Sequence, residues 1–335
     1  MNVVNESLGA AATREQVVQR IRSDRRFVLA THENPDGDAL GSLVGMQGLL
    51  AALGKEVAMF IAPEDLPVPR EYRGLPLSHL IQAPPEDIAQ RTVIFLDCGN
   101  IDRSSARVLR DGAHLVNLDH HHDNTRFGTL NYVVPEASCT AEIVWDLMHD
   151  LDVAPTPEVA QALYIGLITD TGRFMYENTG KQAHLMAADL IEAGVDVHDI
   201  YRHVYEGVPY GKLALLARGL ANVQRYDDGR LTITDLSVGD FSDSDAQESY
   251  SEGVIDHLRA VQGTRLAALV RDRLGAAGNG GTRKVSLRAG DDAIDVSAIA
   301  RAQGGGGHRQ AAGFSTQLSY DELVSFLREQ LAAQS

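Results

Sequence analysis

The sequence predicts an α/β protein with two domains: a doubly wound, mostly parallel sheet, followed by a smaller α/β domain. Its 335 residues are too many for one typical compact domain and suit two. In the first half, continuous apolar runs alternate with helical spacing, and the composition changes near residue 190. We therefore expect a first domain at 12–189, a helical linker at 190–212 and a second domain at 213–335, with the active site in the cleft between the domains.

Apolar runs and helical spacing place the elements of the first domain. "RFVLAT" (26–31) reads as a strand that ends in a polar loop, and "DALGSLVGMQGLLAAL" (38–53) has the spacing of a helix. Further strands are expected at 57–62, 92–99 and 114–120, and further helices at 140–150, 158–168 and 181–193. Because the strand runs are continuous rather than alternating, both faces of the sheet should be covered.

The second domain is expected to mix both kinds of element. Its strands are "LTITDL" (231–236), "TRLAALVRD" (264–272) and "RKVSLRA" (283–289). Its helices are expected at 250–261, 296–301 and 320–332.

The composition indicates a folded protein of a reducing compartment. Hydrophobic residues make up 44% and charged residues 23%, which are ordinary globular values. The two cysteines, Cys98 and Cys139, form no CxxC pattern, which argues against a thiolate zinc site and a disulfide scaffold. The N-terminus lacks the plan of a signal peptide, and no apolar run is long enough to span a bilayer. We expect a cytoplasmic protein with no membrane partner.

The charge is unevenly distributed along the chain. The net charge of −16 argues against a surface that coats nucleic acid. Residues Ile255 to Ala312, however, hold nine Lys and Arg against five Asp and Glu, a local charge of +4. This asymmetry suits a small anionic ligand held at one place, with multivalent cations neutralising part of the acidic remainder.

Acidic and histidine side chains follow four apolar segments. His32, Asp36 and Asp38 follow the first strand, and Asp97 closes the run at 92–99. "LDHHHDNTRF" (118–127) closes a third run with Asp119, His120, His121 and His122, and Asp170 follows a helical run in "LITDTGRF". Since ligands gather at the carboxyl ends of strands in open α/β sheets, these side chains are expected at one rim.

Carboxylate and imidazole ligands without sulfur suit Mn²⁺, Mg²⁺, Fe²⁺ or Co²⁺ better than structural zinc. Six such ligands exceed what one ion needs, and a shared carboxylate can bridge two cations about 3.5–4 Å apart. Each segment alone also has a plain interpretation, since "NPDG" forms turns and a strand-end Asp can act as a cap. Burying several ionisable groups together needs a compensating partner, which favours bound cations.

The second domain carries its own candidate ligand site. "GGGGHRQAAGF" (304–314) places glycines where a backbone can approach a ligand, and Arg288 on "KVSLRA" can hold a phosphate with two hydrogen bonds. A flexible turn and an exposed strand charge are the plain interpretations of these two features.

Five motifs, in this order, resemble the DHH phosphoesterase family: "HENPDGDALGS", "LDCGN", "LDHHHDN", "SCTAEIVWDL" and "LITDTGRF". The later "VSLRAG" and "DVSAIARAQGGGGHRQAAGF" resemble its associated C-terminal domain. The resemblance covers nearly the whole chain and is nearest to the NrnA-type subgroup. These are small bacterial enzymes that degrade very short RNAs and dephosphorylate 3′-phosphoadenosine-5′-phosphate (pAp).

The resemblance implies a role for each site residue. His32 and Asp36 would bind one divalent cation, with Mn²⁺ expected first and Mg²⁺ or Co²⁺ as alternatives. Asp38, His120 and Asp170 would bind the second cation, and Asp97 would bridge the two. Asp119 would sit behind His120 and fix its ring, and His121 would face the scissile phosphate. His122 would be a bystander, and Asn124 would hold the loop.

The resemblance also implies the substrate contacts and the reaction. Ser286, Arg288, Gly306, Gly307 and His308 would bind the base or terminal phosphate of a nucleotide. Apart from the resemblance, Arg103 in "NIDRSS" is a candidate to reach the phosphate, and a surface ion pair explains it equally well. The expected reaction is metal-dependent hydrolysis of short oligoribonucleotides to nucleoside 5′-monophosphates and of pAp to AMP and phosphate.

Other functions stay open from the sequence alone. A cyclic-di-AMP or linear dinucleotide phosphodiesterase would use the same site, and a non-catalytic nucleotide sensor would keep the fold. A pyrophosphatase fits the cation motifs but not "GGGGH", and a RecJ-like DNA exonuclease would need a further DNA-binding domain. A homodimer is expected from the resemblance only.

Overall fold

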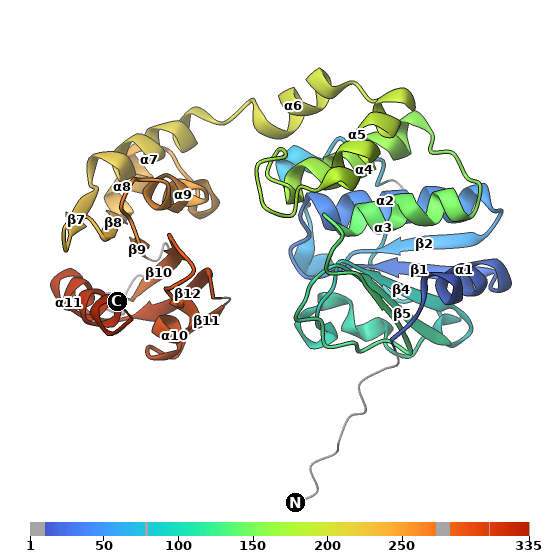
Figure 1. Cartoon of the computed structure of the whole chain (residues 1–335), viewed down its shortest axis with the longest axis horizontal. Coiled ribbons are helices and arrows are strands. Elements are labelled where there is room, and N and C mark those ends of the chain that lie inside the picture. Colours follow the sequence, from blue (N-terminus) through green and yellow to red (C-terminus); the bar gives the residue numbers. More distant parts are fainter. Residues whose placement is uncertain (1–10, 78–79, 273–281, 308, 335) are drawn as a thin grey trace, which may run out of the picture. The chain divides into compact units, whose positions relative to one another are not determined.

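The structure, a computed structural model, describes residues 11–77, 80–272, 282–307 and 309–334 (Figure 1). It divides into two compact units, unit 1 at Met1–Gly207 and unit 2 at Val208–Ser335. The predicted fold class is confirmed, because each unit combines helices with a sheet of its own.

Within the described residues, the sheet of unit 1 has six strands, all parallel, in the order β3-β2-β1-β4-β5-β6. The strands are β1 (Arg26–Ala30), β2 (Glu56–Phe60), β3 (Leu80–Ile81), β4 (Thr92–Leu96), β5 (His114–Asp119) and β6 (Leu130–Val133). The order reverses between β1 and β4. In an open parallel sheet, the carboxyl ends of strands at such a reversal flank a ligand-binding crevice.

Long helices cover one face of this sheet, and short 3₁₀ helices cover the other. The helices are α1 (Arg14–Ser23), α2 (Gly37–Ala52), α3 (Thr140–Asp150), α4 (Pro157–Asp170), α5 (Lys181–Glu192) and α6 (Val197–Tyr205). Figure 1 shows α2 and α3 lying over the sheet, and these helices contribute to the larger core. The second core packs β1 and β4 against η4 (Ile101–Arg103) and η5 (Ser105–Leu109). Both faces are therefore buried, as the continuous apolar runs predict.

Close contact between α2 and α4 brings their polar ends together. An added Cβ on Gly41 would lie 2.4 Å from the carbonyl oxygen of Ala162, so only glycine allows this approach. At the start of α2, an added Cβ on Gly37 would lie 2.4 Å from the side-chain oxygen of Thr169. Asp36 and Asp38 are thereby held beside Asp170, from a segment more than 130 residues away in the sequence.

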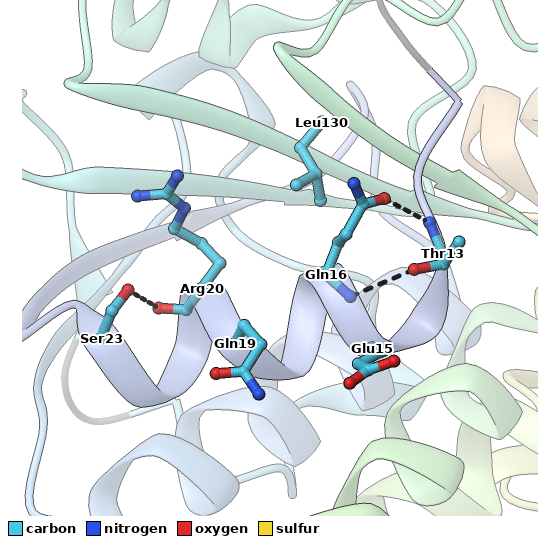
Figure 2. A pocket seen from close by; sticks show the side chains of 7 residues that line it. All are labelled: Thr13, Glu15, Gln16, Gln19, Arg20, Ser23 and Leu130. Carbon is cyan, nitrogen blue, oxygen red and sulfur yellow. Dashed lines mark hydrogen bonds between the residues drawn. The ribbon is translucent and has the colours of Figure 1, made fainter.

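The first helix begins with a capping box. The Thr13 hydroxyl accepts from the Gln16 amide at 3.3 Å, and the Gln16 side chain accepts from the Thr13 amide at 2.8 Å (Figure 2). The hollow beside α1 in this view is lined mainly by polar side chains and by Leu130. The predicted site residues do not line this hollow.

The segment expected to be a linker is shared between the two units. Helix α6 packs on unit 1, where Ile200 is buried and the Tyr205 hydroxyl donates to the carbonyl of Ile168 at 3.1 Å. Helix α7 (Tyr210–Ala221) belongs to unit 2, whose core includes Leu215. Gly207, the last residue of unit 1, has a φ of +69°, a conformation that favours glycine.

Unit 2 is built on a mixed sheet in the order β11-β12-β10-β9-β8-β7, in which β8 and β9 are parallel and the other pairs antiparallel. Its strands are β7 (Gln224–Tyr226), β8 (Leu231–Leu236), β9 (Leu266–Asp272), β10 (Arg283–Ala289), β11 (Gly306–Gly307) and β12 (Ala311–Thr316). Its further helices are α8 (Val238–Asp243), η6 (Glu248–Ser251), α9 (Val254–Arg259), α10 (Val296–Arg301) and α11 (Tyr320–Ala333). Separate apolar clusters cover the two faces.

Across the described ranges, no helix combines the length and the apolar character needed to cross a bilayer.

Candidate metal centre and active site

The candidate site lies at the strand-order reversal of unit 1. The loop after β1 carries His32 and Asp36, and the loop after β4 begins with Asp97. Two overlapping groups of potential metal ligands meet there, namely His32 with Asp36 and Asp97, and Asp97 with His120 and His121. Asp97 belongs to both groups and is therefore the centre of the site.

Asp97 is held in an unusual backbone conformation at the end of β4. Its φ is +56°, in the left-handed region that residues other than glycine rarely adopt, and its side chain is only 3% exposed. One carboxylate oxygen, Oδ2, lies 3.5 Å from Nε2 of His32, and the other, Oδ1, lies 3.7 Å from Nε2 of His120. The two oxygens of one carboxylate thus face two different imidazoles.

His32 and Asp36 form one side of the site. Asp36 caps α2 by accepting from the amides of Asp38 and Ala39, both at 3.1 Å. His32 Nε2 lies 3.8 Å from Asp36 Oδ1, while Nδ1 lies 2.7 Å from the carbonyl of Glu33. A proton on Nδ1 satisfies that carbonyl and leaves Nε2 as the ligand atom.

Asp38 is fixed by the N-terminus of α3. Its two oxygens accept from the backbone amides of Thr140 at 2.7 Å and Ala141 at 2.9 Å, and the side chain is 1% exposed. The helix end satisfies part of the buried charge, because its free amides and dipole favour an anion.

His120 is the residue whose surroundings suit a cation ligand best. Its Nε2 is buried and has no hydrogen-bond partner in the described part of the chain. Carboxylate oxygens surround it at 4.0 Å from Asp38, 3.7 Å from Asp97 and 3.7 Å from Asp170. These separations are too long for hydrogen bonds but suit ligands that each bind one central ion at about 2.0–2.2 Å.

The electrostatics of these acids point the same way. Burial, with repulsion from Asp97 and Asp170, raises the pKa of Asp38 well above its usual value. Burial and the neighbouring Asp97 and Asp36 likewise raise the pKa of Asp170 to about 7. The acids crowd one another, and a bound cation would supply positive charge that offsets their repulsion.

His32 currently supplies part of that positive charge. Burial alone would lower its pKa, but Asp36 and Asp97 raise the pKa of His32 to about 11. A metal ion would replace this proton, because the ligand form of imidazole is neutral. The Asp and His residues therefore fit oxygen- and nitrogen-binding divalent cations by residue type, burial and arrangement.

One sequence prediction about orientation is wrong. Asp119 does not fix the ring of His120, whose Nδ1 lies 3.3 Å from the carbonyl of Ala137. Asp119 Oδ1 instead lies 2.8 Å from Nδ1 of His121, and it accepts from the backbone amide of His120 at 2.8 Å. The strand ends at Asp119, so its carboxylate folds back over the following amides and meets the second histidine.

His121 is the exposed member of the group that it forms with Asp97 and His120. Its side chain is 44% exposed, and its bond to Asp119, with the neighbouring Asp97, raises the pKa of His121 to about 9 against the effect of burial. Asn124 ties the loop together by donating to Asp119 and, at 2.7 Å, to Asn117. His122 is exposed.

Sequence reasoning missed two residues that hold candidate ligands in place. The Thr140 hydroxyl donates to Asp97 Oδ1 at 3.1 Å, and the Asn178 amide donates to Asp170 Oδ2 at 3.0 Å and to the carbonyl of Ser138 at 2.8 Å. Thr140 stands in the quoted motif "SCTAEIVWDL", but its partner becomes visible only when α3 meets the end of β4.

In unit 2, the predicted substrate residues gather on β10 and its neighbours. Ser286 lies opposite Gly313 of β12, and Gly313 lies opposite Gly306 of β11. Arg288 is on the same face of β10, two residues from Ser286, and Gly307 has a φ of +139°. His308 and the side chain of Arg103 lie outside what the structure describes.

Comparison with known proteins gives the class. The N-terminal domain of the DHH family matches residues 26–167, and the DHHA1 domain matches residues 234–333. The chain belongs to the DHH family of phosphoesterases. A bifunctional oligoribonuclease and PAP phosphatase NrnA of Thermus thermophilus is 31% identical over 90% of this chain and 89% of its own length. The Bacillus subtilis protein of the same description is 24% identical over 94% and 96%.

Solved structures support the fold. An exopolyphosphatase-related protein from Bacteroides fragilis has a TM-score of 0.83 at 23% identity, covering 96% of this chain and 95% of that chain. An exonuclease RecJ bound to manganese has a TM-score of 0.54 at 16% identity, covering 98% and 96%.

Proposed function

We propose that the protein hydrolyses short oligoribonucleotides to nucleoside 5′-monophosphates, and pAp to AMP and phosphate. The reaction would use two divalent cations, with Mn²⁺ as the preferred ion. The observation that carries this proposal is Asp97, whose two oxygens face His32 and His120 at 3.5 and 3.7 Å. A carboxylate shared between two ligand groups is the arrangement of two-metal phosphoryl chemistry. The similarity to relatives described as oligoribonuclease and PAP phosphatase supports this choice of substrates.

In this proposal His32 and Asp36 would hold one cation, and Asp38, His120 and Asp170 would hold the other. Asp97 would be a ligand shared by both. The bound pair supplies an activated water and neutralises phosphoryl charge. The protein's own part is to keep the ligands in place, through the α3 amides on Asp38 and the Thr140 hydroxyl on Asp97.

His121 is proposed to contact the scissile phosphate. Asp119 engages Nδ1, so the exposed ring is held in one orientation, with Nε2 free of hydrogen bonds within the described residues. From there it can donate a hydrogen bond to a phosphoryl oxygen or a proton to the leaving oxygen.

Ser286, Arg288, Gly306, Gly307 and His308 are proposed to bind the nucleotide in unit 2, and Arg103 to contact the phosphate. Ser286, Gly313 and Gly306 lie opposite one another on three adjacent strands. This row supports the assignment, because the two glycines place no side chain between a ligand and the hydroxyl of Ser286. A guanidinium such as that of Arg288, two residues along, suits a phosphate by charge and by its paired donors.

A panel of substrates tests the proposal. The full chain is stripped with EDTA, reloaded with Mn²⁺, Mg²⁺ or Co²⁺, and given pAp, a diribonucleotide, cyclic-di-AMP and a long RNA. We expect Mn²⁺-dependent hydrolysis of pAp and the diribonucleotide, with slow turnover of the long RNA. Preference for cyclic-di-AMP would replace the proposed substrate, and nucleotide binding without turnover under any cation would indicate a sensor.

A further inference from the structure

Unit 2 contains a buried arginine whose charge has no acidic partner. Arg271 lies on β9, next to the end of the strand, and is only 9% exposed. Among the described residues, no carboxylate oxygen comes within 4.0 Å of its guanidinium. The nearby acids Glu248 and Glu252 are exposed, and they only partly oppose the effect of burial, which lowers the pKa of Arg271.

The guanidinium instead contacts two serine hydroxyls. One terminal nitrogen donates to Ser251 Oγ at 2.6 Å, and the other donates to Ser286 Oγ at 3.2 Å. The third nitrogen, Nε, is buried and has no partner in the described chain. A buried charge satisfied only by two neutral hydroxyls is costly, so its retention calls for a counter-charge from elsewhere.

The contact with Ser286 has a chemical consequence. A serine hydroxyl has one hydrogen to donate and two lone pairs to accept with. Because Arg271 occupies a lone pair, the hydrogen of Ser286 is directed toward another acceptor. Ser286 is half-buried, and its neighbours in the row, Gly313 and Gly306, present no side chain that could accept it.

The surroundings favour an anion as that acceptor. Lys284, directly opposite Arg271 in the strand register, and Arg288 stand on the same face as Ser286. Lys284 is exposed, and Arg288 is only loosely paired, at 3.9 Å, with Asp256. This face thus offers the oriented hydroxyl of Ser286 with three positively charged side chains around it. Lys284 and Arg288 flank the hydroxyl, and Arg271 is buried beside it.

We infer that Arg271 is a positioning residue that turns Ser286 into a donor for a terminal phosphate group, so that the protein distinguishes phosphorylated from unphosphorylated ends of short nucleotides. This inference rests on the proposed function, since it assumes that Ser286 meets the substrate. It adds two points to the proposed function: a role for buried Arg271, which does not itself touch the substrate, and a phosphate group as the end of the nucleotide that Ser286 binds.

Binding without turnover tests the inference. The full chain in EDTA is titrated by calorimetry with diadenylate carrying a 5′-phosphate and with the same dinucleotide carrying a 5′-hydroxyl. We expect the wild type to bind the phosphorylated form about tenfold more tightly, as a hydrogen bond to a charged group allows. In Arg271→Met, the ratio of the two affinities, phosphorylated over unphosphorylated, should fall near one. Arg271→Lys keeps the charge and should restore part of the preference for the phosphorylated dinucleotide.

Stability separates positioning from a structural role. Methionine matches the length of arginine and removes a buried charge, so Arg271→Met should unfold at the wild-type temperature or above it. Arg283→Met is the matched control, because Arg283 belongs to the same sheet but pairs with Asp272 at 3.5 Å, and its ratio should equal that of the wild type. Ser286→Ala should give the same affinity ratio as Arg271→Met. The double variant should lower this ratio no further than either single variant does.

Three results would overturn the inference: a wild-type ratio near one, an unchanged ratio in Arg271→Met, or an equal loss in Arg283→Met. If Arg271→Met does not fold, a wild-type ratio in Ser286→Ala overturns it. Failure of the proposed function shows differently, as absence of Mn²⁺-dependent hydrolysis in the wild type.

Discussion

At the scale of single residues, Asp97 organises the site. Its left-handed backbone, its burial and the division of its oxygens between His32 and His120 make it the candidate for a shared ligand. Strained backbone in a residue that carries function is common, because the surrounding structure stabilises it. The sequence predicts the residue from its place at a strand end, whereas the left-handed conformation depends on tertiary contacts.

Asp97→Asn keeps the size of the side chain and removes its charge. We expect Mn²⁺-dependent turnover of a diribonucleotide to fall at least about a thousandfold, because neither cation keeps its shared anionic ligand. Steady-state kinetics measures this, with Asp111→Asn, an exposed acid outside the site, as the control. Near-normal turnover of the variant in manganese buffer would refute the bridging role.

Thr140→Val removes one hydrogen bond from Asp97 without changing the shape of the buried side chain. We expect activity at limiting Mn²⁺ to fall by about 10- to 100-fold, as for other residues that orient a metal ligand. Thr140→Ser keeps the hydroxyl and should stay near the wild type. Equal activity of the two variants across a Mn²⁺ titration would show that the hydroxyl is not needed.

The limits of sequence reading at this scale are physical. The sequence predicts five candidate ligands because they follow strands and helices that end at one rim, namely His32, Asp36, Asp38, His120 and Asp170. Thr140 and Asn178 are not, because hydroxyl and amide side chains have many ordinary uses, and only the fold shows which carboxylate each one meets. The partner of Asp119 was predicted wrongly because the sequence does not show how the loop turns after β5.

At the scale of elements, spacing and end signals predict the regular parts well. The helices at 140–150 and 296–301 and the strands at 231–236 and 283–289 agree with α3, α10, β8 and β10 at both ends. The short strand β6 was not predicted, because four residues carry too little pattern. The short 3₁₀ helices on the second face were not predicted for the same reason.

The junction of α1 and β4 gives a pH-dependent prediction. Burial opposes ionisation of Asp24, but hydrogen bonds from Thr92 and Ser23, with Arg20 nearby, lower its pKa below 3.8. A carboxyl group whose pKa is lower in the folded state stabilises the fold at pH values above its unfolded-state pKa. This stabilisation is lost as the pH falls through the folded-state pKa. Asp24→Asn should therefore unfold at lower urea than the wild type at pH 7, and the difference should shrink below pH 3.8. A difference that does not change with pH would contradict this.

At the scale of the whole molecule, the two units carry different kinds of charged groups. The Asp and His groups suited to cations lie in unit 1, whereas the segment of local charge +4 lies in unit 2. The sequence predicts both the count of domains and this asymmetry. The sequence places the end of the first domain at residue 189 because α6 has the spacing of a connecting helix. In the structure, α6 packs on unit 1 through buried Ile200 and the hydrogen bond from Tyr205 to the carbonyl of Ile168.

Cation binding should stabilise the chain. Buried Asp38 and Asp97 and half-buried Asp170 repel one another. A cation that binds only the folded state stabilises it by about 2.7 kcal/mol at a free concentration one hundred times its Kd. Thermal unfolding of EDTA-treated protein should shift upward with Mn²⁺ and return with fresh EDTA. Asp97→Asn should lose most of the shift, and a full shift in this variant would place the bound ion elsewhere.

The most direct test of the central claim is anomalous diffraction at the manganese edge, from crystals of the full chain grown with Mn²⁺. We predict two peaks about 3.5–4 Å apart, one beside His32 and Asp36 and one beside Asp38, His120 and Asp170, with Asp97 between them. Peaks away from these residues, or no peak among them at saturating Mn²⁺, would contradict the two-cation site.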